Sequence, residues 1–260
     1  MPEPVSERHI PEIEAWRHKL KTLENRSAVT TKQVKHFLGG VMELFQNLDP
    51  CPKLQAYHKT TLAEVASRLS GKCLEEYIIA DLNADIPFVG DFLRETSQTI
   101  CQEYGIPPCV AVLYNRRPKP VVGEFRQRRI QGKRLGTMKF FWRWDTFSWD
   151  TDPISPQRVG NCLHEGAHAL QFHMRDDEVW FRRFPAANTL FALDMDVREC
   201  RVLDRFKDIE NHPDSSTYYR ACPIEQDARE AVKSQRTFLD RMKAMTMELY
   251  NNPDVIPPAF

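Results

Sequence analysis

The stretch 154–174 constrains the fold of this chain most, because its apolar residues repeat at spacings of three and four. This spacing predicts an amphipathic helix with one buried face, made by Val159, Leu163, Ala167, Leu170 and Met174. Ser155 is a favourable N-cap residue and Pro156 suits the first helical turn, so the helix is expected to begin there. His164 and His168 each directly follow a residue of the buried face. Both imidazoles are therefore expected at the border between the core and the surface.

The two histidines can bind one metal ion, because residues four apart on a helix lie on one side, about 40° apart in projection. Glu165 lies about 100° around the helix from His164, where it can act as a general base on a water rather than as a ligand. A catalytic zinc takes a third protein ligand. Glu225 is the preferred candidate because it follows the buried Ile224 in a second predicted helix. Asp227 is the alternative, either as the ligand or as the partner of a ligating histidine.

These residues resemble a known family. The segment HEGAH is similar to the His-Glu-x-x-His signature of the zincin metallopeptidases, and PIEQDA resembles the glutamate-bearing helix of the gluzincin-type branch. The resemblance covers roughly residues 105–248. The residue six positions after His168 is Met174, so the three-histidine metzincin arrangement is not expected.

The resemblance implies an α+β, zincin-like fold in which a small twisted sheet packs on the active-site helix. It also implies one Zn²⁺ per chain, held by His164, His168 and Glu225, and hydrolysis of a peptide bond in a protein or peptide substrate. Glu165 would take a proton from the metal-activated water and deliver it to the leaving amine.

The developing oxyanion needs a further donor, and three residues close to Glu225 in the sequence are candidates: Tyr218, Tyr219 and His212. Tyr218 is the candidate that we add to the catalytic set. Cys162 is expected to be a packed core residue rather than a nucleophile.

Three short strands are expected before the helix, at Val110–Tyr114, in 121–131 and in 136–144. In the last one, Met138, Phe140, Trp142 and Trp144 alternate with other residues, as in a sheet with one packed face. The zincin resemblance implies an edge strand that pairs with an extended substrate, and 136–144 is the candidate for that edge. Helical patterns fill about 9–104, with a capping box at Thr30 and Gln33, and return at about 187–209 and 223–248. We therefore predict a helical N-terminal region, 1–104, and a metallopeptidase core, 105–260.

Composition excludes several classes of protein. Lys and Arg total 36 and Asp and Glu total 36, so no net charge favours nucleic acid or a membrane surface as a partner. No apolar run approaches the ~20 residues of a membrane span, and the first residues lack a signal-peptide pattern. The seven cysteines include no Cys-x-x-Cys pair. Reduced thiols, and hence a soluble cytoplasmic protein or one delivered into another cell's cytosol, are expected.

Two alternative functions stay open. One is a different metal-dependent amide hydrolase built on the same residues. The other is a non-catalytic interaction module whose helical N-terminal half binds a partner, with the metal structural or absent. Glu165 separates the classes, because only an enzyme has turnover to lose in Glu165→Gln.

Overall fold

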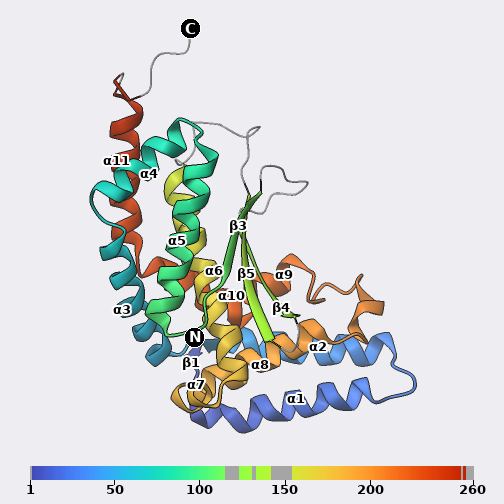
Figure 1. The fold of residues 1–260 in the computed structure, drawn as a ribbon. Helices are drawn as coiled ribbons and strands as arrows, with labels where there is room; N and C mark the ends of the chain where they lie inside the picture. The colour runs from blue at the N-terminus through green and yellow to red at the C-terminus, as the bar shows by residue number, and fades with distance from the viewer. Residues whose placement is uncertain (1, 115–122, 131–132, 142–153, 253, 256–260) are drawn as a thin grey trace. The chain divides into compact units, whose positions relative to one another are not determined.

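The computed structural model describes residues 2–114, 123–130, 133–141, 154–252 and 254–255. Within these ranges the protein is mostly helical with small sheets (Figure 1), which confirms the α+β class. None of the described helices combines the length and the apolar composition that a membrane span requires.

The chain divides into two compact units. The first contains residues 1–57 and 171–230, and the second contains residues 58–170 and 231–260. Each unit thus combines segments from both sides of residue 104. The boundary predicted between a helical region and a metallopeptidase core stays a prediction.

The first unit is built around α8 (Pro185–Glu199), a helix buried along most of its length. Helix α1 (Ile10–Glu24) packs on α8, and α2 (Thr31–Asn47) contacts α1 and α9 (Ser216–Ala221). The predicted capping box at Thr30 and Gln33 is present at the start of α2. The unit also holds β1 (Glu3–Pro4) paired in parallel with β2 (Leu48–Asp49), two 3₁₀ turns (Glu7–His9 and Leu203–Phe206) and α7 (Glu178–Arg183).

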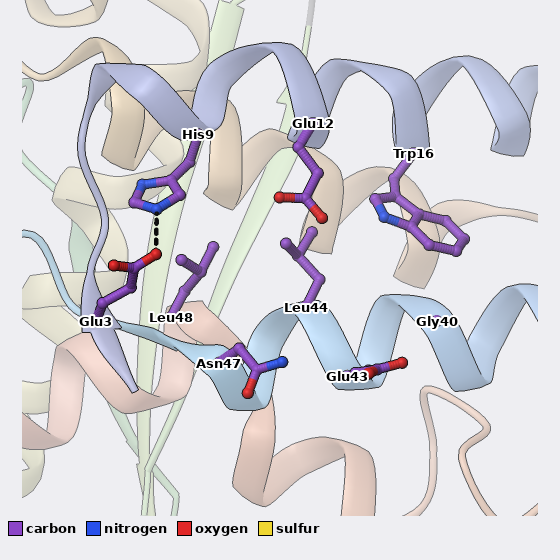
Figure 2. Close-up of a pocket in the computed structure, with 9 residues that line it drawn as sticks. All are labelled: Glu3, His9, Glu12, Trp16, Gly40, Glu43, Leu44, Asn47 and Leu48. Atoms are coloured by element: carbon purple, nitrogen blue, oxygen red, sulfur yellow. Dashed lines mark hydrogen bonds and ion pairs between the residues drawn. The ribbon is translucent and has the colours of Figure 1, made fainter. Parts of the chain in front are cut away.

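A glycine sets the close approach of α1 and α2. A Cβ atom at Gly40 would lie 2.1 Å from the Trp16 ring, so a larger residue there would displace the indole. Beside this contact lies a hollow of about 520 Å³, shown in Figure 2, whose lining includes the carboxylates of Glu12 and Glu43. At one end the His9 ring lies 3.1 Å from a carboxylate oxygen of Glu3. The hollow is polar and is lined entirely by residues from the first 48 of the chain.

The second unit joins several helices to a three-stranded sheet. Most of α3 (Pro52–Arg68) belongs to it, with α4 (Lys72–Leu82), α5 (Ile86–Tyr104) and α11 (Arg236–Tyr250). Asp85 caps the start of α5 by accepting a hydrogen bond from the Phe88 amide, and Gly105 follows its last residue in the left-handed conformation. Helix α6 (Ile154–Asp176) contributes its part up to Leu170.

The sheet contains β3 (Val110–Tyr114), β4 (Gly123–Ile130) and β5 (Lys133–Phe141), in the order β3-β5-β4. All three predicted strands are confirmed. Strand β5 pairs in parallel with β3 and antiparallel with β4. The alternation in β5 is also confirmed where its side chains are described, because Met138 and Phe140 are buried and Lys139 is partly exposed. Trp142 and Trp144 lie outside the described residues.

The prediction that 136–144 is an edge strand is wrong. Strand β5 is the centre of the described sheet, because β4 pairs with one of its sides and β3 pairs with the other. The edges of this sheet, as far as the structure describes it, are β3 and β4.

The long helices predicted near the C-terminus are shorter than expected. The pattern at 187–209 corresponds to α8, which ends at Glu199, followed by turns. The pattern at 223–248 divides into α10 (Pro223–Lys233) and α11. The break includes Gln235, which is buried and donates its side-chain amide to the Lys59 carbonyl oxygen at 3.2 Å. A tertiary hydrogen bond thus lies at a break that periodicity alone does not reveal.

Candidate metal centre

Helix α6 carries the two histidines, and buried polar groups hold its first turn. The helix begins at Ile154, one residue before the predicted N-cap. Ser155 does not cap it but donates its hydroxyl to Asp81 of α4. Arg158 forms an ion pair with the same carboxylate, and both Arg158 and Asp81 are at least nine-tenths buried. A buried, paired charge of this kind fixes the start of α6 against α4.

One face of α6 packs tightly against α5. A Cβ atom at Gly166 would lie 2.4 Å from Cγ2 of Ile100. One turn earlier, Cys162 Sγ lies 3.2 Å from the Ser97 hydroxyl. Burial raises the pKa of Cys162 to about 12, so this thiol is a packed group rather than a nucleophile at neutral pH.

The histidines lie on the other side of α6. His164 follows Cys162 by two positions and His168 follows Gly166 by two positions. Two positions correspond to about 200° around the helix, so the histidines point away from α5. The Nε2 atoms of His164 and His168 are 3.1 Å apart, and the two rings are nearly perpendicular. Two nitrogens bound to one tetrahedral zinc at the usual Zn–N distance lie about 3.3 Å apart. The pair therefore fits a single ion, although a direct hydrogen bond between neutral rings would have the same length.

Glu165 and Glu225 are both buried carboxylates, each with 6% of its surface exposed. Glu165 belongs to α6 in the second unit. Glu225 is the third residue of α10 in the first unit, where the Arg198 guanidinium lies 3.9 Å from its Oε1 atom. A carboxylate that is largely removed from water suits a metal ligand or a proton acceptor better than a solvated one.

Asp227, the alternative third ligand, is engaged in another role. Its Oδ2 accepts a 2.7 Å hydrogen bond from the side chain of Gln171, and its Oδ1 accepts one from Gln55. Gln171 also donates to the carbonyl oxygen of Ile224. Asp227 thus ties α10 to α3 and α6, and both of its oxygens accept amide protons. This arrangement favours Glu225 as the ligand.

The candidates for oxyanion stabilisation lie in different environments. Tyr218 is completely buried, and its hydroxyl donates a 2.8 Å hydrogen bond to Asp194. Burial also raises the pKa of Tyr218. His212 is buried and uses both ring nitrogens, on the Leu203 carbonyl and the Asp214 amide. Tyr219 is exposed. The hydroxyl of Tyr218 is therefore committed to Asp194, which assigns it a supporting contact rather than one with substrate.

Two residues that the sequence analysis did not select lie close to Glu225. They are Asp194 and Arg198, one turn apart on α8, joined by a 3.0 Å ion pair. Asp194 has no exposed surface. The one sequence signal for this pair was the position of Asp194 within the mostly apolar stretch FALDMDV, because a charged residue in a buried helix usually has a partner.

Comparison with known proteins gives no relative: no protein-family model, no curated protein and no solved structure matches the chain. The interpretation of the site therefore depends on its residues and their geometry.

Proposed function

We propose that the chain is a zinc-dependent metallopeptidase, in which His164, His168 and Glu225 hold one Zn²⁺ and Glu165 is the general base. One observation carries the proposal. The Nε2 atoms of His164 and His168 lie 3.1 Å apart on one helix, close to the separation of two nitrogens that bind the same tetrahedral zinc. Glu225 is the carboxylate that we propose as the third protein ligand.

The hydrogen bonds of Gln171 support the pairing of these residues independently. Gln171 is three residues after His168 on the same continuous helix, so its side chain leaves α6 on nearly the same side as the two histidines. It bonds to Ile224 and Asp227, the residues that flank Glu225 closely in the sequence. The side of α6 that carries the histidines is therefore the side that Gln171 attaches to α10.

The chemistry of the three ligands favours a catalytic rather than a structural ion. Structural zinc sites are closed and rich in cysteine, whereas two histidines and one carboxylate leave a coordination position open. Such an ion, when bound, polarises a carbonyl group and lowers the pKa of water.

Glu165 supplies the proton transfer in the proposed reaction. Its carboxylate accepts a proton from the attacking water and later donates it to the nitrogen of the leaving amine. Glu165 is buried and directly follows the proposed ligand His164 on α6. An extended peptide substrate would add to the sheet at β3 or β4, the edges of the described sheet.

Metal content tests the ligand set. Purified protein without a tag should contain about one zinc per chain by elemental mass spectrometry, and His164→Ala, His168→Ala and Glu225→Ala should each lose it. His173→Ala is the matched control, because His173 lies on the same helix with its ring near Asp177 and should leave zinc content unchanged. Zinc retained by Glu225→Ala alone would exclude Glu225 as a ligand. Wild-type protein that takes up no zinc would contradict the proposal.

Turnover by a Glu165 variant separates an enzyme from an interaction module. Glu165→Gln should retain zinc but lose nearly all cleavage of substrates found by a proteome-wide search with wild-type protein. Equal cleavage by the variant would exclude Glu165 as the base. Zinc binding without any cleaved protein in the wild-type search would favour the module with a structural metal.

A further inference from the structure

Helix α10, which carries Glu225, begins without a good cap of its own. Cys222 occupies the N-cap position, and cysteine is a poor cap compared with serine, threonine or aspartate. The next residue, Pro223, has no amide hydrogen. The first free amide of the helix belongs to Ile224, and it donates to Oδ2 of Asp194 at 3.4 Å. A carboxylate from α8, thirty residues earlier in the chain, therefore serves as the cap.

Asp194 is held rigidly for this purpose. It has no exposed surface, and its Oδ1 accepts hydrogen bonds from the Tyr218 hydroxyl at 2.8 Å and from Nε of Arg198 at 3.0 Å. The Tyr218 ring packs edge-on against Phe45 of α2, which fixes the hydroxyl in turn. Hydrogen bonds to a buried carboxylate are strong, and they leave Asp194 little freedom.

Arg198 extends the same network to Glu225. Its guanidinium donates to Sγ of Cys222 and lies 3.9 Å from Oε1 of Glu225. Burial alone would lower the pKa of Arg198, but the charge of Asp194 raises it, so the side chain stays a cation. One cation thus contacts both the buried aspartate and the proposed metal ligand.

We infer that Asp194, Tyr218 and Arg198 form a positioning network that fixes the carboxylate of Glu225 for metal binding. The inference rests on the proposed function, because it assumes that Glu225 is a ligand. It assigns Tyr218 to the support of a ligand instead of to the oxyanion. Groups that orient ligands in this way typically change metal affinity 10- to 100-fold when they are removed.

Zinc affinity distinguishes positioning from mere support of the fold. Tyr218→Phe removes one hydroxyl and keeps the ring, and Asp194→Asn removes the charge with little change of shape. Both variants should weaken Zn²⁺ binding 10- to 100-fold in competition with a chromophoric chelator. Thr189→Val is the matched control, because Thr189 is buried on the same helix and bonds only to the Pro185 carbonyl among the described contacts. It should lower the melting temperature of zinc-free protein and leave zinc affinity unchanged.

The outcomes separate this inference from the proposed function. In one outcome, wild type binds zinc tightly and the folded variants Tyr218→Phe and Asp194→Asn have zinc affinities within threefold of wild type. That result would overturn the positioning network alone. No zinc bound by wild type would overturn both. If Asp194→Asn fails to fold, Tyr218→Phe decides the matter, since deletion of one hydroxyl leaves the Asp194–Arg198 pair in place. A weaker affinity in both variants, with the control unchanged, supports the network.

Discussion

Cys162 shows how strongly burial determines the chemistry of a single residue. It lies two residues before His164, but it has no exposed surface and burial raises its pKa to about 12. At pH 8 only about one thiol in ten thousand would be ionised. Native protein treated with iodoacetamide should therefore be labelled at the exposed Cys73 well before Cys162, as measured by mass spectrometry of the peptides.

Denatured protein is the control for this labelling, since all seven thiols are free and should react there at similar rates. Native Cys162 that reacts as fast as Cys73 would show that the thiol is accessible, and a cysteine nucleophile would then have to be considered.

The residues of the proposed metal centre could be selected from the sequence to different degrees. His164, Glu165 and His168 could be selected from the sequence because they lie on one helix. The relative positions of residues on one helix depend only on their separation in the sequence. The sequence favoured Glu225 over Asp227 only because Glu225 follows the buried Ile224. The hydrogen bonds from Gln55 and Gln171 to Asp227 come from distant parts of the chain and could not be predicted. Tyr218 was selected for its closeness in sequence to Glu225, which gives no information on whether its hydroxyl faces a cleft or a buried aspartate.

At the scale of elements, the packing of α6 predicts opposite effects for alanine at two of its glycines. A Cβ atom at Gly160 would meet its nearest neighbour at an ordinary 3.6 Å, whereas one at Gly166 would lie 2.4 Å from Ile100. Gly160→Ala should stabilise the protein by about 0.5–1 kcal/mol through helix propensity. Gly166→Ala should destabilise it by about 1–3 kcal/mol through overpacking. Urea unfolding of the two variants measures both effects.

A compensating change sharpens this comparison. Ile100→Val removes the δ-methyl group, but the Cγ2 atom that meets Gly166 remains, so it should restore little; Ile100→Ala removes the clashing atom. The double variant Gly166→Ala with Ile100→Ala should therefore be more stable than the sum of the single effects predicts. Strict additivity would mean that the two helices are not in contact at this point.

Elements themselves were predictable where their signals are local, and their arrangement was not. The alternation in 136–144 identified a strand, and the capping box identified the start of α2. Which strand lies at the centre of the sheet depends on pairing, and β3 adds to β5 from more than twenty residues away. The break after α10 similarly includes the bond from Gln235 to Lys59, which are far apart in the chain.

At the scale of the whole molecule, three of the described helices pass from one compact unit to the other. Helix α3 does so after Tyr57, α6 after Leu170 and α10 after Glu230. The proposed ligands come from α6 and α10, about sixty residues apart in the chain. An unfolded chain does not hold such distant groups together, so zinc should bind the folded state far more tightly.

This difference predicts a stability that depends on zinc concentration. An ion that binds only folded protein stabilises it by about 2.7 kcal/mol at one hundred times its dissociation constant. For a chain of this size that corresponds to a rise in melting temperature of roughly 5–10 °C. Zinc titrated into chelator-treated protein should produce this rise in wild type and in His173→Ala, but not in His164→Ala, as followed by scanning calorimetry. An equal rise in His164→Ala would mean that the stabilising ion binds elsewhere, because the 3.1 Å pair of imidazole nitrogens cannot form without that ring.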